Sequence, residues 1–187
     1  MKIINNIVTV LVKLMEIGYW IGTAASTVFF FISLTGVKSH NFFNFLTFKQ
    51  DGLSANGLNF IFKNASSDYV AAYPIFFLTN VVVCILFAWI FRCINLTFAT
   101  AQGKTKYSEG ETFFQQANVK FIRYIGLFSI GIILVEFVMM LITKFIYGTD
   151  ITVFINYTPI NMGVIILCLS QFFSQAVELQ KDVDGLL

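Results

Sequence analysis

The sequence predicts an all-α integral membrane protein, an antiparallel bundle of four transmembrane helices that forms a single membrane domain over residues 1–187. Its four long apolar stretches are each long enough, because a helix needs about 20 mostly apolar residues to cross about 30 Å of hydrocarbon. Hydrophobic residues make up 57% of the chain and charged residues 12%, against about 25% charged in soluble domains. The predicted spans are residues 14–35, 73–97, 119–143 and 159–179, joined by an outer loop over 36–72 and an inner loop over 98–118.

An amphipathic segment precedes the first span. We expect it to be helical, and either to lie in the membrane interface or to continue the first span. Lys13 and Glu16 are three residues apart, so they are expected to form an ion pair at the membrane edge. The apolar side of this segment consists of Ile3, Ile4, Ile7, Val8, Leu11, Val12 and Met15.

The first span carries small residues at four-residue spacing, namely Gly18, Gly22 and Ser26. Such a series lets another helix approach closely. Packing within the chain is the favoured use, and association into a homo-oligomer is the alternative.

The outer loop combines two kinds of sequence. Residues 41–48 are rich in Phe and predict a short helix or strand on the bilayer surface, whereas residues 51–57 are typical of turns. Basic residues are fewer on this side, which favours cytoplasmic N- and C-termini in a multi-pass protein of the cell membrane. The inner side would hold Lys2, Lys13, Arg92, Lys104, Lys106, Lys120, Arg123 and Lys181, and the outer side Lys38, Lys49, Lys63 and Lys144.

The inner loop contains a capping-box pattern, Ser108 followed by Glu111. The pattern predicts an interfacial helix that starts near Glu109, carries Phe113 and Phe114 on one face, and bends into the third span.

Two stretches, residues 113–126 and 176–184, resemble a bacterial family of four-span membrane proteins known as domain of unknown function 2975. Family members tend to end in an acidic residue, Asp, Leu and Thr, but here Asp184 is followed by Gly185, Leu186 and Leu187. The family is often encoded beside a small helix-turn-helix transcription factor. The resemblance therefore implies a membrane sensor or regulator whose partner is a DNA-binding protein.

Glu136 lies among apolar residues in the outer half of the third span. A charged residue there costs about 2.5 to 3.5 kcal/mol on insertion scales, so its side chain should face protein or water. One hypothesis is a proton- or cation-responsive site or a polar anchor for a ligand. The other is a hydrogen bond to a neighbour at similar depth, such as Thr79, Asn80 or Asn161.

Charged residues gather where the second, third and fourth spans meet the inner side. They could form a docking site for a cytoplasmic partner, or they could serve as ordinary interfacial anchors and a solvated tail. These residues are Arg92, Lys120, Arg123, Glu178, Asp182 and Asp184.

No catalytic pattern is present in the sequence. Serines such as Ser129 and Ser170 have no His to activate them, because the one histidine, His40, belongs to the outer loop. We expect no cofactor, no metal site and no direct nucleic-acid binding. The three cysteines, Cys84, Cys93 and Cys168, are expected to pack as small hydrophobic residues.

The sequence thus predicts a non-enzymatic inner-membrane protein that contacts membrane lipid and acts as a sensor or regulator. It would bind a cytoplasmic partner, such as a helix-turn-helix transcription factor, through the inner loop and the tail. Two alternatives stay open. One is a small oligomeric transporter or channel subunit that uses Glu136, and the other is an immunity protein against a membrane-active peptide, suggested by the aromatic outer loop.

Overall fold

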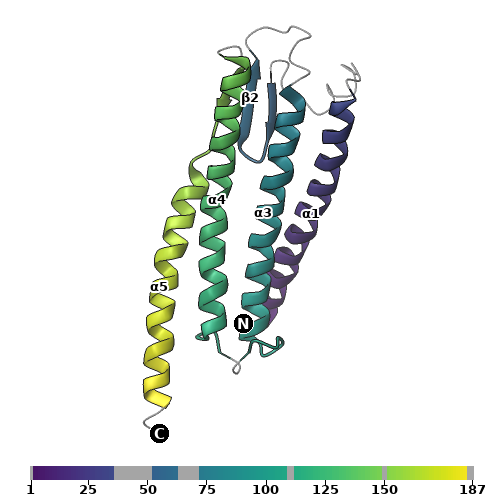
Figure 1. The fold of residues 1–187 in the computed structure, drawn as a ribbon. Helices are drawn as coiled ribbons and strands as arrows, with labels where there is room; N and C mark the ends of the chain where they lie inside the picture. Colours follow the sequence, from purple (N-terminus) through teal and green to yellow (C-terminus); the bar gives the residue numbers. More distant parts are fainter. Residues whose placement is uncertain (1, 36–51, 63–71, 109–111, 149–150, 185–187) are drawn as a thin grey trace. The chain divides into compact units, whose positions relative to one another are not determined.

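A computed structural model describes residues 2–35, 52–62, 72–108, 112–148 and 151–184 (Figure 1). Its four long helices are each long and apolar enough to cross a membrane, which confirms the predicted all-α, four-span fold class. The predicted surface segment at residues 41–48 lies outside the described residues. The elements are α1 (Lys2–Leu34), β1 (Gly52–Ala55), β2 (Leu58–Phe62), α3 (Ala72–Ala101), α4 (Gln116–Tyr147), β3 (Ile151–Phe154) and α5 (Thr158–Asp184).

The helices exceed the predicted spans at most of their ends. They contain 33, 30, 32 and 27 residues, and therefore measure about 40 to 50 Å at 1.5 Å per residue. Pro74 and Pro159 lie in the first turns of α3 and α5, where a missing N–H costs nothing. Gly103 and Gly148 follow the ends of α3 and α4 with φ of 71° and 60°, as in helix C-terminal caps. Since a hydrocarbon layer is about 30 Å thick, each helix is longer than this thickness by roughly 10 Å or more.

Two predicted boundaries can be compared with the structure. The amphipathic N-terminal segment belongs to the same continuous helix as the first span, so the continuous alternative is correct. The predicted interfacial helix is wrong for residues 112–115, which are not helical, while 109–111 lie outside the described residues. The physical reason is local competition for backbone carbonyls. The Gln115 side chain donates to the Thr112 carbonyl at 2.7 Å, and the Asn118 side chain donates to the Phe113 carbonyl at 3.0 Å.

The chain divides into two compact units. Unit 1 contains Met1–Gly18, Leu86–Gly131 and Thr158–Leu187, and unit 2 contains Tyr19–Ile85 and Ile132–Tyr157. Helices α1, α3 and α4 contribute a segment to each unit, whereas α5 belongs to unit 1 alone.

In unit 1, α5 runs beside the first half of α4 (Figure 1). The two helices are close together at Gly126 and Gly163, where a Cβ atom built on Gly163 would lie 2.9 Å from the Gly126 carbonyl oxygen. Nearer the start of α4, the rings of Phe114 and Phe173 are 5.8 Å apart. These contacts make α4 and α5 antiparallel.

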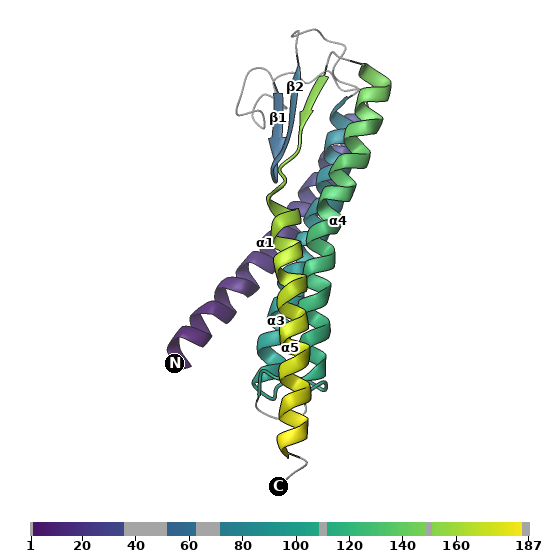
Figure 2. The same ribbon diagram turned by 90° about the vertical axis from the view of Figure 1, so that its left-hand side faces the viewer.

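Unit 2 contains a three-stranded antiparallel sheet in the order β1-β2-β3 (Figure 2). Asn56 and Gly57 form its first turn with φ of 52° and 93°, the left-handed conformation that two-residue hairpins require. The prediction of turns over residues 51–57 is therefore correct for Asn56 and Gly57 but wrong for 52–55, which pair with β2 as a strand. The core of unit 2 joins this sheet to the start of α3 and consists of Leu53, Phe60, Ala72, Phe76, Phe77 and Ile151.

Candidate functional site

One end of unit 1 carries most of the exposed charge of the described residues, and we call it the charged end. At this end α3 finishes, α4 starts and α5 finishes. Asp184 is the last residue of α5, and its side chain lies outside the described part of the structure. The exposed charged side chains here are Lys104, Lys106, Lys120, Arg123, Glu178, Lys181 and Asp182.

The end of α5 extends past the start of α4 (Figure 1). Val177 is the last buried residue of this helix, at 2% exposed, and we call the segment from Glu178 to Asp184 the C-terminal arm. Leu179 and Val183 are 66% and 57% exposed and are four residues apart. They therefore share one side of the arm and form an uncovered apolar pair.

Glu16 forms a polar junction between α1 and α3 within unit 1. It is only 5% exposed, and its carboxylate lies 3.1 Å from the Lys13 Nζ and 4.0 Å from the Arg92 Nη1. The Asn95 side-chain amide donates to the same carboxylate at 3.4 Å. The predicted Lys13–Glu16 ion pair is confirmed. Arg92, which the sequence predicts to bind a partner, pairs with Glu16 in the structure. The single acid of α1 was a signal that could have predicted a cationic or amide partner on another helix.

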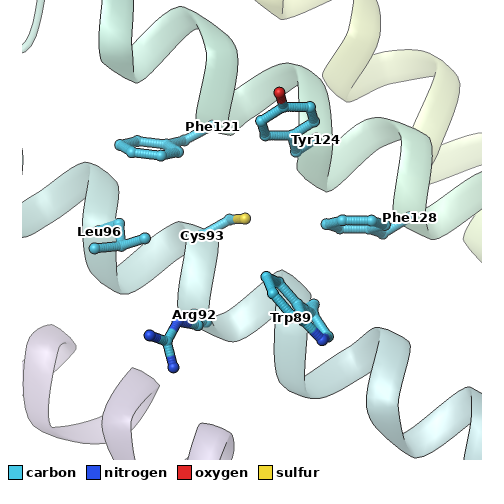
Figure 3. Close-up of a pocket in the computed structure, with 7 residues that line it drawn as sticks. All are labelled: Trp89, Arg92, Cys93, Leu96, Phe121, Tyr124 and Phe128. Carbon is cyan, nitrogen blue, oxygen red and sulfur yellow. The ribbon is translucent and has the colours of Figure 1, made fainter.

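A groove of about 270 Å³ lies between α3 and α4 in unit 1 (Figure 3). At one end of the groove the rings of Trp89 and Phe128 are 6.3 Å apart, and the Tyr124 ring stacks on Phe128 at 6.2 Å. The Arg92 guanidinium extends away from these rings (Figure 3). The lining residues are Trp89, Arg92, Cys93 and Leu96 from α3, and Phe121, Tyr124 and Phe128 from α4.

The polar residues predicted inside the membrane do not pair as expected. Glu136 is 1% exposed, and its Oε2 has no hydrogen-bond partner in the described part of the chain. The predicted bond from Thr79 or Asn80 to Glu136 is not formed. Thr79 donates to the Ile75 carbonyl at 2.7 Å instead. Asn161, the third predicted neighbour, is exposed on the first turn of α5.

Asn80 instead joins three elements of unit 2. Its amide donates to the Ser26 hydroxyl of α1 at 2.6 Å, and its carbonyl oxygen accepts from the Asn56 amide of the β1–β2 turn at 2.7 Å. The Asn56 amide also lies 3.2 Å from the Cys84 sulfur. This arrangement anchors the hairpin turn to two helices.

The predicted helix-packing residues have different surroundings. Gly22 faces α3, because a Cβ atom built there would lie 3.6 Å from the Cys84 sulfur, and Ser26 bonds Asn80 of the same helix. A Cβ atom built on Gly18 would meet nothing within 4 Å. The glycine contact between α4 and α5 was missed by sequence reasoning, although Gly126 and Gly163 each lie inside a predicted span.

The described residues contain no group of three or more His, Cys, Asp or Glu side chains that could hold a metal ion. All three cysteines are free, with Cys84 and Cys93 buried and Cys168 exposed. Neither Ser129 nor Ser170 is set up as a nucleophile, since each donates its hydroxyl proton to a carbonyl of its own helix. These features describe a site that can bind, through the arm, the basic side chains and the groove.

No protein-family model matches the chain, and neither the curated proteins nor the solved structures give a match. The resemblance drawn from residues 113–126 and 176–184 stays a prediction.

Proposed function

We propose that this chain is a non-enzymatic membrane regulator that binds a cytoplasmic protein through the C-terminal arm. One observation carries the proposal: the arm continues as a helix beyond Val177 and presents Leu179 and Val183 without cover from the described chain. An apolar pair at four-residue spacing on a helix is the usual anchor of a helix that docks in a groove of another protein.

The length of α5 supports a position of this pair beyond the hydrocarbon. Counted from Thr158, about 20 residues are enough to cross the membrane and bring the chain to Val177. The arm then lies in the interface or in water, where exposed apolar side chains gain free energy when a partner covers them.

The charge on the arm favours a basic partner. Glu178 and Asp182 are four residues apart and exposed, and therefore lie together on the arm next to the apolar pair. A small DNA-binding protein has the basic surface that would complement these acids. The distribution of Lys and Arg along the sequence supports a cytoplasmic location of the arm.

The proposal is tested by in-cell photocrosslinking, with a photoreactive residue at position 179 and a matched control at position 172. Phe172 is also exposed, at 67%, but it precedes Val177 and lies outside the C-terminal arm. A protein captured from position 179 and not from 172 is then purified, and its affinity for the intact chain is measured in detergent.

Replacing both Leu179 and Val183 by Ala should weaken that affinity about tenfold or more, because each truncated anchor costs at least about 1 kcal/mol. Phe172→Ala should leave it unchanged. Equal affinities for the intact chain, the arm variant and a chain ending at Leu179 would show that the arm is not the docking element.

A further inference from the structure

The groove between α3 and α4 runs along the helices rather than across them. On α3, Trp89, Cys93 and Leu96 are spaced by four and three residues, so they share one face of the helix. The lining residues of α4 are spaced by three and four residues and also share one face. Because Trp89 meets Phe128 and the helices are antiparallel, Leu96 and Phe121 lie at the opposite end, nearer the charged end (Figure 3). The groove is therefore a slot that follows the direction of α3 and α4.

The walls of this slot suit a hydrocarbon chain. The side chain of Cys93 lines the slot and is only 5% exposed, and most of the other lining residues are aromatic. Trp89 and Tyr124 are 45% and 48% exposed, so they border the opening. These are the side-chain types that tolerate both acyl chains and headgroups at a membrane interface.

Three cationic residues lie on the stretches of α3 and α4 that border the slot, and one of them, Arg92, belongs to its lining. Lys120 and Arg123 are exposed, immediately precede Phe121 and Tyr124 in sequence, and form no ion pair among the described residues. Lys120 is also four residues before Tyr124, so the two side chains are neighbours on the surface of α4. Arg92 stands on the α3 side, where Glu16 balances part of its charge at 4.0 Å.

We infer that this slot is a binding site for an anionic phospholipid. One acyl chain lies between Trp89, Cys93 and Phe128, and the phosphate is bound by Lys120 and Arg123. An apolar slot between membrane helices with basic residues at its interfacial end has the chemistry that recognises anionic headgroups. The inference concerns a surface separate from the C-terminal arm and does not depend on it.

Trp89 provides a direct readout of the occupied slot. The chain has two tryptophans, so Trp20→Phe leaves Trp89 as the one indole fluorophore. In mixed bilayers, phosphatidylglycerol with brominated acyl chains should quench Trp89 fluorescence at a mole fraction at least about fivefold lower than brominated phosphatidylcholine of the same chain length. Equal quenching by the two lipids overturns the inference.

Charge variants in the same background test the headgroup. Each basic residue removed should weaken the preference for phosphatidylglycerol over phosphatidylcholine about fivefold. With both Lys120→Gln and Arg123→Gln, the two brominated lipids should therefore quench Trp89 at similar mole fractions. Lys144→Gln, which removes an exposed charge at the far end of α4, is the matched control and should leave the preference intact. If the preference survives the double variant, or falls equally with Lys144→Gln, the assignment of the headgroup site is wrong.

A volume variant tests the acyl chain. Cys93→Leu fills part of the slot and should reduce quenching by both lipids, whereas Cys168→Leu changes an exposed residue of α5 and should not. Unchanged quenching in a folded Cys93→Leu protein excludes the slot as the binding site. If Cys93→Leu does not fold, the variants Lys120→Gln and Arg123→Gln still test whether an anionic phospholipid binds here.

Discussion

Gly126 on α4 and Gly163 on α5 bring their backbones so close that neither position has room for a side chain. A Cβ atom built on Gly163 would lie 2.9 Å from the Gly126 carbonyl oxygen and 2.8 Å from the Ile130 side chain. One built on Gly126 would lie 2.7 Å from the Leu167 side chain. Membrane helices associate largely through such close packing, because lipid offers no hydrophobic driving force between them.

The first prediction concerns this contact. Gly163→Ala should lower the free energy of unfolding by about 1 to 3 kcal/mol, because the new methyl group meets a backbone atom that cannot move aside. Unfolding can be followed by circular dichroism in mixed micelles with increasing SDS. Gly18→Ala is the control, since its added methyl group meets nothing within 4 Å. Equal stabilities of the two variants would contradict the close approach of α4 and α5.

The second prediction tests the Glu16 junction by charge compensation. Lys13→Gln with Arg92→Gln leaves the buried Glu16 carboxylate with only the Asn95 amide, and should destabilise the fold by about 1 to 3 kcal/mol. Adding Glu16→Gln should recover part of this loss, because the buried group no longer carries a charge. The same SDS titration measures both steps, and Lys181→Gln serves as an exposed control. If adding Glu16→Gln lowers the stability further, Lys13 and Arg92 do not stabilise the buried Glu16 charge.

A third prediction concerns the anchor of the hairpin. Asn80→Ala removes the hydrogen bonds to Ser26 and Asn56, and should cost about 1 to 3 kcal/mol at roughly 0.5 to 1.5 kcal/mol for each bond. Proteolysis of the β1–β2 hairpin should accelerate as well. Asn161→Ala replaces an exposed amide and should change stability by no more than about 0.5 kcal/mol. A hairpin that is equally protected in both variants would show that Asn80 does not hold it.

The fourth prediction tests whether Glu136 is a functional carboxylate or only a buried polar residue of the fold. Gln has nearly the same shape as Glu and no charge, so Glu136→Gln should keep or raise the thermal stability, whereas Glu136→Lys should lower it strongly. A marked loss in Glu136→Gln would mean that the carboxylate itself is needed. In liposomes, an ion flux through the intact chain that Glu136→Gln abolishes would favour the transporter alternative over the regulator.

The helices were predictable because their signal is distributed over many residues. Runs of apolar residues set four spans, and the prolines Pro74 and Pro159 set two of the starts to within two residues. The Lys13–Glu16 pair was predictable because it is local, with a fixed spacing on one helix. Its extension to Arg92 and Asn95 was not, since it depends on which faces of α1 and α3 meet.

The sheet shows the opposite case. Strand β1 consists of Gly52, Leu53, Ser54 and Ala55, of which only the leucine adds a sizeable apolar side chain. Its pairing comes from the Asn56–Gly57 turn and from the burial of Leu53 against Phe60 and its neighbours. Strand β3 is similarly short and lies in a connection that reads as a loop. The groove was equally hidden, because Trp89, Phe121 and Phe128 read in sequence as ordinary residues of apolar spans.

The pairing of β2 with β3 has a consequence for biosynthesis. Phe62 pairs with Ile151, so the two ends of this pairing are separated by α3 and α4 in the order of synthesis. At roughly 5 to 20 residues per second, the free edge of β2 waits for its partner for on the order of 5 to 20 s. The sheet is therefore completed only after both helices have left the ribosome. A chain arrested before Ile151 exposes an unpaired strand edge, which is a surface that quality-control factors can detect.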